Sequence, residues 1–135
     1  MTRTEARNEA FILVFEKIFS NETIEDIISL ATDSRDFEMD NDGYIISAFK
    51  GVYENVEELD SVIEKYLTNW TIDRISKVAL AVLRLAIYEI KFMDDIPESV
   101  SIDEAVELCK KYSTTDDASF VNGLLGSIVR AWASF

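Results

Sequence analysis

The 135-residue chain has no histidine, one cysteine, one proline and four glycines. The missing histidine removes the commonest general base and metal ligand, and a single cysteine cannot form an intramolecular disulfide. So little proline and glycine argues against collagen-like, disordered or turn-rich folds. No apolar run approaches the roughly 18 residues that a membrane span needs, and residues 1–11 lack the apolar core of a signal peptide. We therefore expect a cytoplasmic protein without cofactor or metal, in which any catalysis would rest on carboxylates alone.

Acidic residues outnumber basic ones by 26 to 13, and they are unevenly distributed along the chain. The net charge is −13, and residues 21–70 hold thirteen acidic and three basic residues, which leaves −3 for the two flanks together. Phosphate repulsion opposes unaided nucleic-acid binding by such a chain, so any contact with nucleic acid must use the flanks together with a basic partner. The acidic middle is either a solvated face or a surface that steers a basic protein.

Apolar residues recur with a helical period along nearly the whole chain. This predicts helices over residues 4–19, after Thr23 as N-cap, over 44–67 with a bend near Gly51, over 72–92, from Ser101 to about Tyr112, and over 119–135. Ser101 and Glu104 have the spacing of a capping box, the acidic segment 33–44 is expected to be a loop, and residues 113–118 are expected to be a polar connector. The fold class is all-α, a compact bundle of about six to seven helices in a single domain, 1–135.

Some residues interrupt this apolar pattern. Arg84 and Glu89 lie in the most apolar helix, which should sit at the centre of the bundle, so each charge is expected to pair with another helix. Cys109 is expected to be a buried thiol. Gly123 and Gly126 fall inside the last helix, where each costs about 1 kcal/mol relative to alanine. Either close helix packing or the close approach of a ligand or partner could offset that cost.

Four segments carry a resemblance to a known family: "ARNEAFILVF" (6–15), "WTIDRISKVALAVLRLAIYEI" (70–90), "IPESVSIDEAVELCKKY" (96–112) and "FVNGLL" (120–125). Their order and spacing are similar to those of the NusB family of bacterial transcription antitermination factors, and the resemblance covers almost the whole chain. It implies a non-catalytic helical protein that pairs with NusE, a small-subunit ribosomal protein. The pair binds boxA RNA, notably in ribosomal RNA operons, within the RNA polymerase antitermination complex. A homodimer stays open.

The resemblance also implies contact residues: for RNA Arg3, Arg7, Lys110, Lys111, Asp116, Phe120 and Asn122, and for NusE Phe15 and Ala79. Each of the RNA residues has a structural alternative, and Asn122 could cap its helix or bind the neighbouring connector. The two arginines could belong to a solvated helix start, and Phe120 also fits the apolar stripe. The two lysines suit the negative end of a helix dipole, and Asp116 could be an N-cap.

Three positions depart from the family pattern. Glu5 separates the two N-terminal arginines, Ser119 stands where many relatives have a basic residue, and Ala79 stands where an acidic contact to NusE is usual. These departures favour an alternative function, a NusB-like protein-interaction bundle without RNA binding. A fragment of an RNA-cytosine methyltransferase with a NusB-like domain would need a cofactor domain, for which this length leaves no room.

Overall fold

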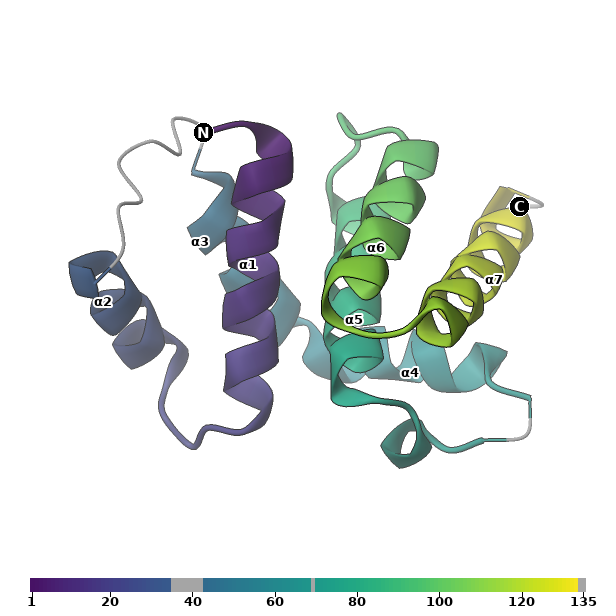
Figure 1. The fold of residues 1–135 in the computed structure, drawn as a ribbon, viewed down its shortest axis with the longest axis horizontal. Coiled ribbons are helices and arrows are strands. Elements are labelled where there is room, and N and C mark those ends of the chain that lie inside the picture. The colour runs from purple at the N-terminus through teal and green to yellow at the C-terminus, as the bar shows by residue number, and fades with distance from the viewer. Residues whose placement is uncertain (35–42, 69, 134–135) are drawn as a thin grey trace.

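The computed structural model describes residues 1–34, 43–68 and 70–133, and the regular structure in these ranges is entirely helical (Figure 1). The elements are α1 (Arg3–Ile18), α2 (Ile24–Ser34), α3 (Tyr44–Glu54), α4 (Val56–Tyr66), the 3₁₀ turn η1 (Ile72–Arg74), α5 (Lys77–Phe92), α6 (Glu98–Tyr112) and α7 (Thr115–Ala133). The all-α class and the expected helix number are confirmed. Most of the predicted loop 33–44 lies outside the described residues. Within the described ranges, no helix has the length and apolar character to cross a membrane.

Helix α5 forms the centre of the bundle, as its all-round apolar sequence predicts. It contacts α1, α3, α4, α6 and α7, and Leu83, Leu85 and Ile87 are almost wholly buried. Ser76 caps its start, because the Ser76 hydroxyl accepts a hydrogen bond from the Ala79 amide at 3.0 Å. Figure 1 shows α6 beside α5, between α1 and α7.

The charges of α5 pair with other helices, as predicted. Arg84 forms a two-pronged contact with the carboxylate of Asp60 on α4, with both N–O distances at 2.8 Å. Glu89 accepts hydrogen bonds from Arg7 on α1. Because both pairs join α5 to a neighbouring helix, the charges in this apolar helix act as structural links.

The predicted helix 44–67 is two helices, separated at Asn55. The Asn55 side-chain amide donates to the Gly51 carbonyl at 2.8 Å, which is the kind of local bond that competes with a helical ladder. Gly51, near which a bend was predicted, lies inside α3 and allows close helix packing. A Cβ atom there would lie 2.1 Å from the ring of Tyr88 on α5, so glycine allows the two helices to approach.

Three predicted helix starts are wrong. The helix expected over 72–92 begins at Lys77, because Ile72–Arg74 forms the separate 3₁₀ turn η1. Helix α6 begins at Glu98, directly after Pro97. Ser101 is therefore no cap: it is buried, and its hydroxyl donates to Glu89 at 2.9 Å. Helix α7 begins at Thr115 rather than near 119, and the amide of Asp117 donates to the hydroxyl of Thr114. By contrast, Thr23 accepts from the amide of Asp26 at 3.1 Å, which confirms it as the cap of α2.

Candidate nucleic-acid and partner interface

Arg7 lies inside the fold, although the resemblance implied a contact with RNA phosphates. It is 3% exposed, and its Nε and Nη2 atoms donate to the Glu89 carboxylate at 2.7 and 3.0 Å. Its Nη1 atom lies 3.5 Å from Glu104. Tyr44 and Ser101 also donate to Glu89. Burial alone would lower the pKa of Arg7, but the hydrogen bond and charge of Glu89 raise it. Arg7 therefore joins α1 to α5 and α6 and is withdrawn from the candidate RNA contacts.

Arg3 stays near the surface, at the start of α1. It is half-buried, and its Cζ atom lies 4.6 Å from the centroid of the Tyr44 ring, which is a cation–π geometry. The first turns of α1 and the facing side of α6 enclose a hollow of about 290 Å³. Its charged lining residues are Glu5, Glu9, Glu104, Glu107 and Lys111. This mostly negative lining repels phosphates, so the hollow suits a cation better than RNA, and Arg3 is not one of its lining residues.

Lys110 and Lys111 are both exposed in the last turn of α6. The Lys110 ammonium lies 3.5 Å from Glu107, an exposed pair that contributes little. The Lys111 ammonium donates to the Asn8 side chain on α1 at 3.0 Å, and the Tyr112 hydroxyl donates to the same oxygen at 2.9 Å. Lys111 therefore faces α1, while both lysines keep charge at the surface.

The start of α7 presents polar side chains to solvent. Asp116 is exposed in the first turn and is not the cap, since Thr114 takes that role. Asn122 and Gly123 are also exposed, and a Cβ atom added at Gly123 would meet nothing within 4 Å. Close packing within the described chain therefore does not explain Gly123. Gly126 differs, because a Cβ atom there would lie 3.2 Å from Arg130.

Phe120 is half-buried against the core, and Trp70 covers it from outside. The two rings are stacked, with centroids 5.8 Å apart and planes 23° from parallel. Trp70 is 57% exposed. The sequence predicted Phe120 as a stacking residue or a core residue, but it gave no prediction for Trp70, the first residue of the resembling segment 70–90.

The two residues expected at the partner surface lie in different environments. Ala79 is completely buried in the first turn of α5, so the expectation that it contacts a partner is not supported: its methyl group packs into the core. Phe15 is half-buried within an aromatic row that runs along α1. The row consists of Phe19, Phe15, Phe11 and Tyr112, with neighbouring ring centroids 5.1, 5.9 and 5.0 Å apart.

Phe19 and Tyr112, the two ends of this row, are exposed at 65% and 38%. Sequence reasoning missed both, although the four-residue spacing of Phe11, Phe15 and Phe19 marks one helix face. Aromatic side chains on one exposed stripe are typical anchors for a protein partner.

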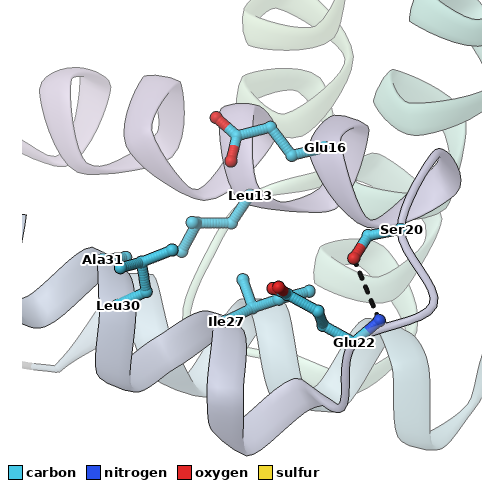
Figure 2. A pocket seen from close by; sticks show the side chains of 7 residues that line it. All are labelled: Leu13, Glu16, Ser20, Glu22, Ile27, Leu30 and Ala31. Atoms are coloured by element: carbon cyan, nitrogen blue, oxygen red, sulfur yellow. Dashed lines mark hydrogen bonds between the residues drawn. The ribbon is translucent and has the colours of Figure 1, made fainter.

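A second hollow, of about 120 Å³, lies between α1 and α2 (Figure 2). Leu13, Ile27 and Ala31 supply buried apolar lining. Glu16 and Glu22 supply carboxylates, and the Glu22 amide donates to the Ser20 hydroxyl at 3.0 Å. None of the predicted RNA contacts lines this hollow. Over the described part of the chain, no group of three or more acidic, cysteine or histidine residues could hold a metal ion.

Comparisons with known proteins agree on one family. The NusB family model matches residues 4–130. The transcription antitermination protein NusB of Acetivibrio thermocellus is 43% identical over 130 residues, covering 96% of this chain and 90% of that protein. NusB of Clostridium novyi is 40% identical over 133 residues, covering 97% and 100%.

Solved structures agree as well. NusB of T. maritima superposes with a TM-score of 0.84 at 35% identity, covering 96% of this chain and 92% of that one. A chain in the crystal structure of antitermination factors NusB and NusE in complex with dsRNA gives a TM-score of 0.84 at 28% identity. That match covers 97% of this chain and 99% of the other.

Proposed function

The chain belongs to the NusB family of transcription antitermination proteins, which are not enzymes, and from this premise we propose that it pairs with NusE and that the pair binds boxA-type single-stranded RNA. The observation that carries the proposal is the match, over nearly the full length of both chains, to a structure of NusB and NusE with RNA. The proposed setting is the cytoplasm, on nascent RNA such as that of ribosomal RNA operons, within the RNA polymerase antitermination complex. The chain acts there as a single domain.

The proposed NusE surface is the accessible part of the aromatic row, Phe19, Phe15 and Tyr112, which packs on the buried Phe11. Its exposed ends offer apolar area that a partner can bury, and interface energy concentrates in such aromatic anchors. The net charge of −13 supports a basic partner, because opposite charge accelerates encounter. Phe15 keeps its proposed role within this row, while Ala79 is left out because it is buried.

The proposed RNA surface combines exposed groups at the end of α6 and in the first turns of α7 with Arg3. Lys110 and Lys111 supply positive charge, and Asp116 and Asn122 supply groups that can hydrogen-bond to base edges. Phe120 contributes by supporting the exposed ring of Trp70, which stacks on it. Few cations and a strongly acidic chain predict weak binding alone, so a basic partner is needed to hold the RNA phosphates.

Isothermal titration calorimetry with NusE from the same organism tests the partner half of the proposal. We expect a one-to-one complex and about tenfold or greater weakening in Phe19→Ala, because truncating an interface anchor costs about 1–2 kcal/mol or more. Phe92→Ala is the matched control, since Phe92 is also an exposed aromatic, 43% exposed, at the other end of the bundle on α5. Failure of the wild-type chain to bind NusE, with both proteins folded, would contradict the proposal.

The alternative function is a NusB-like interaction bundle that binds protein but not RNA. The acidic hollow between α1 and α6, together with the loss of Arg7 from the surface, favours it. The two functions give the same result in calorimetry with NusE, and they differ only when RNA is added.

A further inference from the structure

Trp70 is the most prominent aromatic surface near the proposed RNA contacts of α7. One face of its ring covers Phe120, and 57% of the residue remains exposed. Phe120 is itself packed against the core. The core, Phe120 and Trp70 therefore form successive layers, and Trp70 is the outermost one. A base that approaches this side of α7 meets the indole before it meets the phenyl ring.

The segment that carries Trp70 is joined to α7 by a hydrogen bond. The Ser76 hydroxyl donates to the Asp117 carboxylate at 2.7 Å, which holds the start of α5 against the start of α7. The hydroxyl of Ser113, at the end of α6, donates to the same oxygen and fixes the Asp117 side chain. The stack with Phe120 holds Trp70 itself, and the Ser76 hydrogen bond holds the other end of the segment 70–76. A ring positioned in this way loses little conformational freedom when a ligand stacks on it.

We propose that Trp70 is the stacking platform for an unpaired base of the RNA, and that Phe120 acts as its support rather than as the direct contact. This inference rests on the proposed RNA-binding function and adds the residue that grips a base. Stacking on an aromatic face is the usual way in which proteins hold unpaired bases, and it tolerates any base identity. It also requires little positive charge, which suits a chain of net charge −13.

The surroundings leave room for the rest of the nucleotide. Gly123 follows Phe120 by three residues, so the two positions are neighbours on the surface of α7. The site of the missing Cβ atom at Gly123 is open space. Arg74 and Lys77, both exposed, lie in the same short segment as Trp70. They are the cations that can approach a phosphate beside the platform, with Asp73 as the nearby opposing charge.

Tryptophan fluorescence tests the contact directly, because the chain has only one other tryptophan, Trp132. The Trp132→Phe variant leaves Trp70 as the only indole, and the variant that also carries Trp70→Phe gives the background. Each variant is mixed with NusE and titrated with a boxA-type single-stranded RNA, while the anisotropy of a labelled copy reports binding. We expect Trp70 emission to be quenched in step with binding. Unchanged emission at saturating RNA would overturn the proposal, and a purely structural role of Trp70 predicts that result.

Affinity provides the second test. Trp70→Ala should weaken RNA binding by the NusE complex about fivefold to hundredfold, because removing a base-stacking ring costs about 1–3 kcal/mol. Trp70→Phe should recover most of the loss, and Phe92→Ala should have no effect. Wild-type affinity in a folded Trp70→Ala variant would refute this inference alone, since the RNA function would stand. Absence of RNA binding by the wild-type complex would refute the proposed function and this inference with it.

Discussion

Replacing Arg7 by methionine should destabilise the protein severely, because Arg7 and Glu89 form a buried ion pair. The two side chains are 3% and 1% exposed and are joined by hydrogen bonds of 2.7 and 3.0 Å. Arg7→Met removes the cation and leaves the Glu89 carboxylate buried, and among the described residues Tyr44 and Ser101 remain as its donors. Removing one partner of a buried pair costs about 3–5 kcal/mol. Whole-domain stabilities are about 5–15 kcal/mol, so the variant should lose about a fifth or more of its stability.

Urea unfolding followed by far-ultraviolet circular dichroism measures this loss. Arg3→Met is the matched control: Arg3 is half-buried and stacks on the same Tyr44 ring, and its loss should cost about 1 kcal/mol or less. The double variant Arg7→Met/Glu89→Leu should be less destabilised than the sum of its single variants, because it leaves no unpaired charge. A loss below about 1 kcal/mol in Arg7→Met would refute the reasoning, since that is the behaviour of an exposed pair.

Three further predictions concern glycine packing, thiol reactivity and alkaline stability. Gly51→Ala should lower the thermal midpoint, because its Cβ would meet Tyr88 and overpacking costs about 1–3 kcal/mol. Gly123→Ala should raise the thermal midpoint, because alanine in an open helical position adds up to about 1 kcal/mol of stability. Equal shifts in the two variants would contradict both predictions. The thiol of Cys109 should react with a disulfide reagent only on unfolding, because burial, with a smaller effect of Asp117, raises its pKa to about 12; rapid native-state labelling would contradict this. Burial and Glu89 raise the pKa of the Tyr44 hydroxyl. As pH rises above about 10, Tyr44 therefore ionises in the unfolded chain before it does so in the folded one, and the free energy of unfolding should fall. The urea midpoint of Tyr44→Phe should fall less steeply over that range.

The helices could be predicted because their signals are local. The periodicity of apolar residues identified the segments of α1, α3 to α5 and α7, and Thr23 marked the start of α2 from its own side-chain type. The pairing of Arg84 and Glu89 with other helices also followed from sequence, since charges in an apolar helix need partners. Which residues those partners are did not follow, because Asp60 and Arg7 are far away along the chain.

The errors arose where a tertiary contact outweighed a local pattern. Ser101 and Glu104 have the spacing of a capping box, but the Ser101 hydroxyl donates to Glu89 on α5, and α6 already begins at Glu98. The family resemblance implied that Arg7 contacts RNA, but the same carboxylate draws Arg7 into the core. Trp70 and Phe120 are fifty residues apart, so no local pattern could reveal that they stack. At the candidate site, sequence therefore identified the elements better than it identified which side chains are exposed.

The most direct test of the RNA-binding account is the anisotropy of a labelled boxA-type RNA, titrated with this protein alone and with an equimolar mixture with its cognate NusE, at low and moderate salt. Tight binding by the mixture and weak binding by the single chain is the predicted result, because a chain of net charge −13 needs a basic partner to hold phosphates. Absence of binding by the mixture, with the NusE complex confirmed by calorimetry, would contradict the account and leave a bundle that binds protein only.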